Sequence, residues 1–342
     1  MEQAGTVQPK YQDARSSRFW STVLRFQSYF GLIAILVLST LVSPVRNGHN
    51  IFLDPNNLLN IVRFASENGI IAIGMTLVIL IGGIDLSVGA VMALCAVGAA
   101  SFMMRDGLGT LPTVMLVLSI GALAGMINGL VTTRFNIQSF IVTLAMLSIA
   151  RGLASLWSGG YAIPLAFGME AGLAPQSFKT LFAGSVTIGS INIPVQIFYF
   201  LGVGLIASVA LKRTAFGRHV YAVGGNETAS RLSGVNVNRV KTIVFTVSGL
   251  LAGLAALLHA ALVNQGSHID GSGYELNAIA AVVIGGTSLA GGVGTVVGSM
   301  VGAVILSILD NILGLRNIPS EYQMILKGVL IVGAVLVQRR KR

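Results

Sequence analysis

The residue of this chain whose chemistry is hardest to place is an aspartate inside an apolar, glycine-rich stretch. Asp85 lies in IGGIDLSVGA, residues 81–90, with long apolar runs on both sides. A carboxyl group in such a place can carry a proton across a membrane, or it can accept the free amide hydrogens at the start of a helix. Ser87 follows two residues later and can act in the second way. We expect Asp85 and Ser87 to cap the next helix and to form part of a gate on a translocation path.

A nearly identical stretch, IGGTSLAGG, occupies residues 284–292 and has Ser288 at the place of the aspartate. Backbone that leaves a helix inside a bilayer is tolerated only where protein or water surrounds it, and paired glycines permit the tight turn. Both stretches are therefore predicted to be turns at the cytoplasmic end of the path. Thr287 and Ser288 join the candidate path residues.

Two further asparagines interrupt apolar runs. Asn128 and Asn311 are predicted to form hydrogen bonds across neighbouring helices, and both are candidate path residues. Arg63 and Glu67 are four residues apart, so the sequence predicts an ion pair on one helix face.

The remaining charged and imidazole groups suggest no chemistry of their own. Arg151 and Lys327 lie near the ends of apolar runs and are predicted to extend to the membrane interface. His259 and His268 have no second ligand at metal spacing, so no metal site is predicted. The chain has no G-x-x-x-x-G-K-[ST] phosphate loop and no evident nucleophile and base, so we expect neither a cofactor nor enzymatic activity.

The composition indicates the elements that must position these residues. Of 342 residues, 54% are hydrophobic and 10% charged, and the mean hydropathy is +0.81, which is typical of a membrane protein. The net charge of +10 comes without a basic, aromatic-rich face, so nucleic acid is not an expected partner. A single cysteine, Cys95, excludes an internal disulfide. The polar N-terminal stretch is too long for the first part of a secretory signal, so the first apolar run is expected to be retained.

We expect an all-α polytopic bundle of about ten transmembrane helices, because about ten apolar runs are long enough to cross a bilayer, at least when tilted. These predicted spans are 27–43, 60–81, 86–103, 112–132, 139–157, 194–211, 240–262, 275–289, 294–313 and 321–338. The transmembrane domain is thus 27–338, between a cytoplasmic segment, 1–26, and a basic cytoplasmic tail, 339–342.

The distribution of Lys and Arg predicts the orientation. With the N-terminus inside, fifteen of the 22 lie in cytoplasmic segments and four outside, the latter being Arg46, Arg105, Lys179 and Arg316. This bias follows the positive-inside rule, so both termini are expected in the cytoplasm. A second echo, Asn136-Ile137 with Ser139 and Asn317-Ile318 with Ser320, suggests two five-helix halves. It falls on opposite sides of the membrane, as an inverted repeat requires, whereas the two glycine-rich stretches fall on the same side.

Two long loops remain. The outer loop, 158–193, is rich in glycine and serine and is either a surface for a neutral partner or a linker. The inner loop, 212–239, is polar and basic. In it, Asn226 is predicted to cap a short helix over 226–233, with Glu227 in its first turn and Gly234 at its end. A capped helix of this kind, flanked by arginines such as Arg231, can fit a groove on a cytoplasmic protein.

The inner loop resembles the cytoplasmic coupling loop of ABC-importer permeases, whose pattern is Glu-Ala-Ala, three residues, Gly. Here Glu227-Thr228-Ala229 is followed by four residues and Gly234, so one alanine is replaced and one residue is added. Over about 58–338 the chain is similar to the ribose and monosaccharide permeases, which belong with the branched-chain amino-acid permeases. The similarity rests on GMTLVILIGGIDLSVGAVMAL, TAFGRHVYAVGGNETASRLSGVNV, GSGYELNAIAAVVIGGTSLAGG and YQMILKGVLI.

The resemblance implies a type II-like importer in the bacterial cytoplasmic membrane. Two permease subunits, a homodimer, would work with two cytoplasmic ATPase subunits and an external sugar-binding protein. Asn226, Glu227, Ala229, Arg231 and Gly234 would form the contact with the ATPase. Two alternatives stay open: an ion- or proton-coupled secondary transporter of a small polar solute, and a channel-like pore.

Overall fold

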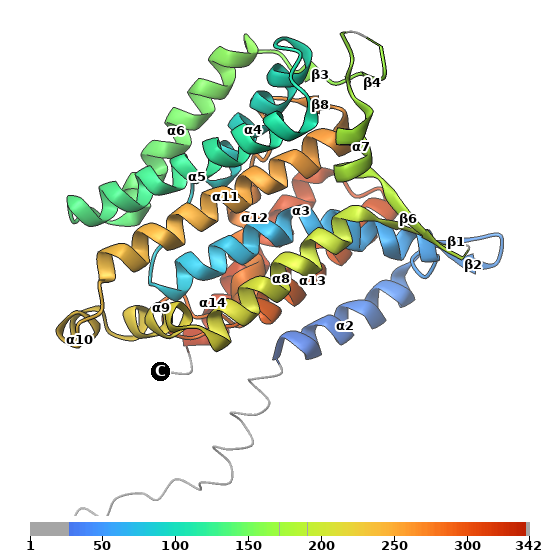
Figure 1. Cartoon of the computed structure of the whole chain (residues 1–342). Helices are drawn as coiled ribbons and strands as arrows, with labels where there is room; N and C mark the ends of the chain where they lie inside the picture. Colours follow the sequence, from blue (N-terminus) through green and yellow to red (C-terminus); the bar gives the residue numbers. More distant parts are fainter. Residues whose placement is uncertain (1–26, 171, 190, 340–342) are drawn as a thin grey trace, which may run out of the picture.

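The long helices of the chain lie side by side and run roughly along one direction (Figure 1). The computed structural model describes residues 27–170, 172–189 and 191–339, so the predicted segment 1–26 and most of the tail 339–342 lie outside the described residues. The helices are α2 Gln27–Val42, α3 Pro55–Leu80, α4 Val88–Met104, α5 Thr110–Arg134, α6 Ser139–Ser158, α7 Gln176–Ala183, α8 Val195–Arg213, α9 Ala215–Gly225, α10 Glu227–Leu232, α11 Val237–Val263, α12 Tyr274–Ile284, α13 Val296–Leu315 and α14 Ser320–Arg339.

Eight short strands also occur and form four two-stranded pairs. Three pairs are local to their loops: β1 Val45–Arg46 with β2 His49–Asn50, β4 Phe167–Gly168 with β5 Ala174–Pro175, and β6 Ser185–Ile188 with β7 Ile191–Pro194. The fourth is antiparallel and joins β3 Ile163–Pro164 to β8 Gln265–Gly266. It ties the outer loop to the segment that follows α11. The bundle itself is α-helical, as predicted.

The predicted spans overlap ten of these helices, although only some of the helices are long enough to cross a bilayer untilted. Among the described residues, six are long and apolar enough to cross: α3, α5, α6, α8, α11 and α13. Ser28–Val42, α4 and α12 are apolar but shorter. The number of ten crossings therefore stays a prediction. The helix α12 ends at Ile284, earlier than the predicted span 275–289, because the glycine turn begins there.

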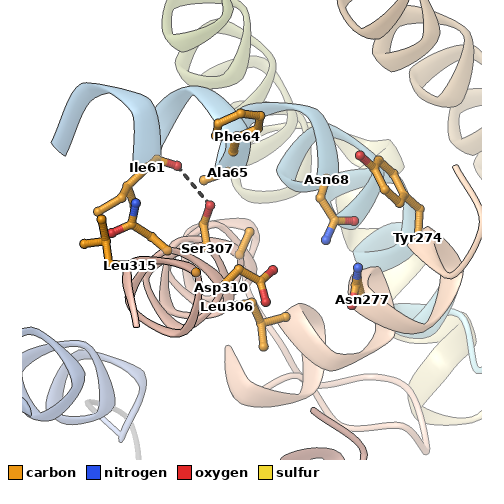
Figure 2. A pocket seen from close by; sticks show the side chains of 13 residues that line it. Ile61, Phe64, Ala65, Asn68, Tyr274, Asn277, Leu306, Ser307, Asp310 and Leu315 are labelled. Carbon is orange, nitrogen blue, oxygen red and sulfur yellow. Dashed lines mark hydrogen bonds between the residues drawn. The ribbon is translucent and has the colours of Figure 1, made fainter. Parts of the chain in front are cut away.

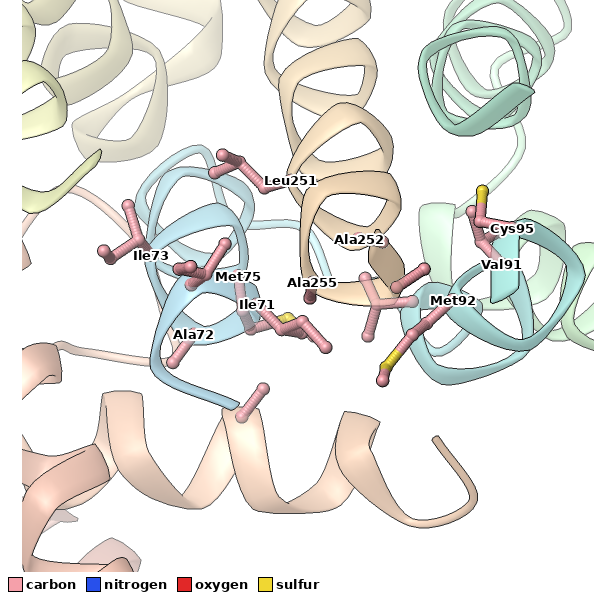
Figure 3. Close-up of a cluster of buried hydrophobic side chains, with 14 of the residues drawn as sticks. Ile71, Ala72, Ile73, Met75, Val91, Met92, Cys95, Leu251, Ala252 and Ala255 are labelled. Carbon is pink, nitrogen blue, oxygen red and sulfur yellow. The ribbon is translucent and has the colours of Figure 1, made fainter. Parts of the chain in front are cut away.

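The core lies around α4 and the inner half of α3. Apart from Phe102 and Met104, every residue of α4 is buried, so this helix is apolar on all sides. Met75 of α3, Met92 of α4 and Ala255 of α11 meet at the centre, above α12 (Figure 3).

Helices α5 and α11 approach closely because glycines face each other. A Cβ atom added to Gly121 would lie 2.4 Å from the carbonyl oxygen of Gly249, and one on Gly125 would lie 2.1 Å from that of Phe245. Only residues without a side chain permit this backbone contact.

The two glycine-rich stretches adopt the same turn. After α3, Gly82 has a φ of 75°, and the amide of Gly83 donates to the carbonyl of Val78. After α12, Gly286 has a φ of 88°, and the amide of Thr287 donates to the carbonyl of Val282. Both are the left-handed helix end that satisfies the last carbonyls with a six-residue hydrogen bond. The echo therefore reflects shared turn geometry.

The second echo also has one backbone conformation. Asn136, after α5, and Asn317, after α13, have φ values of 52° and 54°. They lie at opposite ends of the bundle: Asn136 shares a pocket with Glu227, while Arg316, beside Asn317, donates to the carbonyl of Val42. This arrangement is what an inverted repeat requires, and the repeat as a whole stays a prediction.

The outer loop is not a plain linker. Its helix α7 inserts Phe178 and Phe182, both nearly fully buried, against the bundle. Phe182 stacks on Tyr199 of α8 with ring centroids 5.7 Å apart. Because of this packing, the loop forms a folded cover at the end of the bundle away from α10 (Figure 1).

We predict that Met169 and Ser233 lie on opposite sides of the membrane. In intact cells, an impermeant maleimide should label Met169→Cys, whose parent side chain is 99% exposed, and should not label Ser233→Cys in the exposed turn after α10. In inverted vesicles the pattern should reverse. The native Cys95 is fully buried and gives little background. Labelling of Ser233→Cys in intact cells would contradict the predicted orientation.

Candidate functional site

The two glycine-rich stretches, residues 81–90 and 284–292, are called the first and the second interruption below. A buried hydrogen-bond network centred on Asp85 holds the first interruption in place. Its Oδ1 accepts from the amide and the hydroxyl of Ser87 at 3.0 and 2.6 Å, and its Oδ2 accepts from the Ser248 hydroxyl at 3.0 Å. The amide group of Asn128 donates to the Ser87 hydroxyl at 2.9 Å. All four side chains are at most 1% exposed. The network thus joins the interruption to α5 and α11.

The predicted cap at the start of α4 is wrong in its details. Ser87 is the N-cap residue of α4, but its side chain makes no capping bond. Asp85 instead closes a turn onto the amide of Ser87, two residues on, and the Ser87 hydroxyl donates to the carboxylate. The proximity of the carboxylate to α11 takes the serine hydroxyl away from the helix. The role of Asp85, Ser87 and Asn128 in a gate stays a prediction.

The second interruption lies apart from the Asp85 network. Thr287 is fully buried and packs on Gly294. The amide of Ser288 donates to the carbonyl of Val293 at 2.8 Å, and its hydroxyl accepts from the amide of Ala290. Thr287 and Ser288 therefore shape this turn, and their place on a path stays a prediction.

The end of α9 is wedged between the two interruptions. The amide of Gly292 donates to the carbonyl of Leu80 at 2.9 Å, which joins the second interruption to the end of α3. A Cβ atom on Gly224 would lie 1.7 Å from that carbonyl oxygen and 2.6 Å from the Gly292 amide nitrogen. Tyr221, one turn earlier, donates its hydroxyl to the carbonyl of Gly294. Any displacement of α9 must therefore move both interruptions.

The short helix predicted in the inner loop is present as α10. The side chain of Asn226 accepts from the amide of Ala229 at 2.9 Å, and Gly234, past the helix end, has a φ of 84°. These observations confirm the predicted cap and terminator. Ala229 and Arg231 are exposed. Leu232 is 85% exposed, and sequence reasoning missed it, although a leucine among polar loop residues is a usable signal.

Glu227 faces its own protein rather than solvent alone. Its carboxylate contacts Lys241 at 2.6 Å and Arg231 at 3.3 Å, so it ties α10 to α11. Burial raises the pKa of Glu227, but the hydrogen bonds and charges of Lys241 and Arg231 lower it by more. The net pKa is below the ordinary value, so the link is present at neutral pH and is lost as the pH falls through that lowered pKa.

A cavity of about 460 Å³ with polar and apolar lining lies at the other end of the bundle, between α3, α12 and α13 (Figure 2). Asn68 and Asn277 face each other across it, and Tyr274 and Asp310 point into it. The Oδ1 atoms of Asn68 and Asp310 have no hydrogen-bond partner among the described residues. The cavity therefore offers donors and acceptors to a hydroxyl-bearing solute.

Asn311 lines this cavity, so the predicted path residues fall in three separate places. Its side chain exchanges two hydrogen bonds with Asn57 of α3, at 2.8 and 3.1 Å, as predicted for an amide between helices. Sequence reasoning missed Asn68, Asn277 and Asp310. The available signal was polarity at helical spacing, since Asp310 and Asn311 follow Ser307 by three and four residues on one face of α13.

The predicted ion pair between Arg63 and Glu67 is wrong. Glu67 contacts Nδ1 of His259 at 3.0 Å, and Nε2 of that histidine lies 3.6 Å from Asp270. The guanidinium group of Arg63 lies over the Phe64 ring, 5.2 Å from its centroid. Glu67 points into the bundle, where a partner from α11 is available.

The two charges predicted to extend to the membrane interface are also held by the protein. The guanidinium group of Arg151 donates to the carbonyls of His268 and Asp270, and Lys327 pairs with Asp310 at 2.9 Å. The partners of Arg151 are 117 and 119 residues away in the sequence, and the partner of Lys327 lies on the preceding helix, α13. The described residues contain no group of three or more His, Cys, Asp or Glu side chains that could hold a metal ion.

A bundle of apolar helices with buried polar turns, a polar cavity and an exposed capped helix defines a membrane permease. The family described as branched-chain amino acid transport system, permease component, matches residues 57–335, and this chain belongs to it. It is thus a multi-pass membrane protein and the non-catalytic subunit of an ABC importer. Membership implies an ATPase subunit and a substrate-binding protein as partners.

The chain resembles several curated proteins over nearly its whole length. It is 42% identical to the ribose import permease RbsC of Escherichia coli, covering 96% of this chain and 98% of that protein. It is 40% identical to RbsC of Bacillus subtilis, covering 92% of each. It is 33% identical to the xylose permease XylH of Haemophilus influenzae, covering 92% and 96% respectively.

One solved structure shares the fold. It is an inward-facing ABC transporter assigned to the metal-chelate type, with a TM-score of 0.51 and 16% identity, covering 93% of this chain and 99% of that one.

We predict that Asp85→Asn keeps most transport, because its amide oxygen can still accept from Ser87 and the Ser248 hydroxyl can rotate to accept from the new amide. Asp85→Leu should lose most transport, since it leaves buried donors unsatisfied at about 1–3 kcal/mol each. The measurement is solute uptake normalised to the amount of folded permease. Equal and complete loss in both folded variants would favour a proton-carrying role for Asp85.

Proposed function

We propose that this chain is the permease subunit of an ATP-driven importer of a ribose-like monosaccharide. The observation that carries the proposal is the similarity to two ribose import permeases over more than nine-tenths of both chains. The cavity adds support, because its lining is mostly amide, hydroxyl and apolar groups, which suits an uncharged polyol.

We place the ATPase contact on α10. Ala229, Arg231 and Leu232 are exposed there, while Glu227 is engaged with Lys241 and holds the helix against α11. Glu227 thus acts by positioning α10, whereas Ala229 and Leu232 supply a small site and an apolar anchor for a groove on the partner.

The contacts of α9 with both interruptions can transmit motion from the ATPase to the translocation path. When the ATPase subunits close on ATP, they push α10 and α9, and Gly224 presses on the carbonyl of Leu80 and on Gly292. Both interruptions then move together, and the helices that they end can part. The Asp85 network keeps the first interruption attached to α5 and α11 during this motion.

The importer contains two copies of this permease, two ATPase subunits and an external sugar-binding protein. Both chain termini lie in the cytoplasm. In the structure α2 begins, and α14 ends, at the same end of the bundle as α10, which supports this orientation (Figure 1).

One observation favours a second candidate, a proton-coupled carrier. His259 lies between the carboxylates of Glu67 and Asp270 inside the bundle, and intramembrane ionisable groups often relay protons. The two candidates differ in their energy source. Uptake by the importer stops when ATP is depleted and survives a protonophore as long as ATP is maintained.

We predict that Asn277→Leu reduces ATP-dependent uptake of labelled ribose at least tenfold, because a cavity that loses a partner for a sugar hydroxyl binds it about 1.4 kcal/mol more weakly or worse. Leu276→Ala, at the preceding position of α12 and outside the cavity lining, should leave uptake within twofold. Unchanged uptake in a folded Asn277→Leu variant would show that the sugar bypasses this cavity. Ribose uptake driven by a proton gradient without ATP would overturn the importer itself.

We predict that Ala229→Trp and Leu232→Ser lower co-purification of the ATPase subunit and sugar uptake together, by overpacking and by loss of an apolar anchor. The variants should fold and insert normally, because both side chains are exposed. Met169→Trp, an equally exposed change on the outer loop, is the control and should not alter ATPase co-purification. Normal assembly and uptake in both α10 variants would exclude α10 as the coupling element.

A further inference from the structure

A basic groove lies beside α10, the proposed coupling helix, between the last turn of α5 and the first turns of α11. Its volume is about 860 Å³, and Arg134, Arg231 and Arg239 line it. No carboxylate lies within ion-pair distance of Arg134 or Arg239 among the described residues, while Arg231 shares Glu227 with Lys241. The groove therefore carries positive charge from three helices, α5, α10 and α11, and the charges of Arg134 and Arg239 are uncompensated.

The chemistry of these side chains favours a phosphate group. A guanidinium group is planar and permanently charged, and it can donate two parallel hydrogen bonds to a phosphate. Arginines from two helices that converge on one groove can bind a phosphate from two directions. Asn136 and Asn238, which also line the groove, add uncharged polar groups beside them.

The groove continues into an apolar surface rather than into solvent. On α5, exposed apolar side chains recur every three or four residues up to the arginine, and these are Leu123, Ile127, Leu130 and then Arg134. On α11, Arg239 is followed one turn later by exposed Ile243 and two turns after that by exposed Leu250. Leu130 and Ile243 themselves line the groove. Two apolar stripes thus end at the same pair of arginines.

The close packing of α5 and α11 turns these stripes into one continuous face. Glycines bring the two backbones together along the inner half of α5, where a Cβ on Gly129 would lie 2.6 Å from Cα of Thr242. The two backbones are therefore in contact beside the groove, and the two stripes lie on neighbouring helices.

We propose that this face binds an anionic glycerophospholipid, with its headgroup phosphate on Arg134 and Arg239 and its acyl chains along the α5 and α11 stripes. The leaflet is the one at the α10 end of the bundle, the cytoplasmic leaflet in the proposed orientation. Charge complementarity at the groove and the apolar stripes beyond it match the two parts of one lipid molecule. Because the groove includes Arg231 of α10, the lipid stands directly beside the coupling helix.

The test uses the full-length permease in phosphatidylcholine nanodiscs in which about one lipid in five is phosphatidylglycerol. Native mass spectrometry measures how much phosphatidylglycerol the permease retains. Arg134→Gln combined with Arg239→Gln should lower its apparent affinity about 25-fold, since each arginine at an anionic surface contributes a factor of about five. Arg213→Gln combined with Arg218→Gln removes two exposed arginines outside the groove, so it should change the affinity less than twofold.

Two further arms separate the lipid from other occupants. Leu130→Ser with Ile243→Ser should also weaken lipid retention, whereas inorganic phosphate should bind neither variant nor parent tightly enough to displace the lipid. Retention that is equal in the Arg134/Arg239 double variant and its control overturns the proposal. It is also overturned if the double variant alters only the oligomeric state, or only ATPase binding, because the groove then belongs to a second copy of the chain or to the ATPase.

Discussion

The need to satisfy every backbone amide inside a bilayer shapes this structure more than any other constraint. Helices α3 and α12 end in turns whose flanking residues are buried, so their last carbonyls need partners from the protein itself. The left-handed glycines Gly82 and Gly286 turn the chain so that following amides reach back to those carbonyls. The carbonyl of Leu80 is satisfied from the other interruption, by Gly292. The two breaks are thus one hydrogen-bonded unit, and α9 is built into it.

This arrangement separates two kinds of polar group. At the α10 end, the buried side chains of Asp85, Ser87, Asn128 and Ser248 are linked to one another by hydrogen bonds. In the opposite half, Asn68 and Asp310 keep oxygen atoms without partners, facing a cavity. The first group holds helices in register, and the second is available to a solute. A permease needs both, since the part that moves must stay connected while the part that binds must stay unsatisfied.

Local features of the fold were predictable from the sequence, whereas long-range pairings were not. The apolar runs located the long helices, and Asn226 and Gly234 marked α10, because caps and glycine terminators depend on a few neighbouring residues. Glu67 was predicted to pair with Arg63 because its actual partner, His259, is 192 positions away in the sequence. The partners of Lys327 and Arg151 were likewise not predicted, since they come from other helices and loops. The cavity was not predicted because its residues come from three helices, and the spacing of polar residues on α13 alone does not show which helices face it.

The link between Glu227 and Lys241 has a mechanical consequence. Lys241 lies in the second turn of α11, and this helix runs for 27 residues to the loop that Asp270 and His259 hold at the far end. At 1.5 Å per residue, α11 is a rod about 40 Å long. Helix α10 is attached near one end of it, and the outer loop is attached at the other. A tilt of about 5° displaces the far tip by roughly 3.5 Å relative to the near one. The rod therefore acts as a lever, through which a small push in the cytoplasm reaches the opposite mouth of the protein.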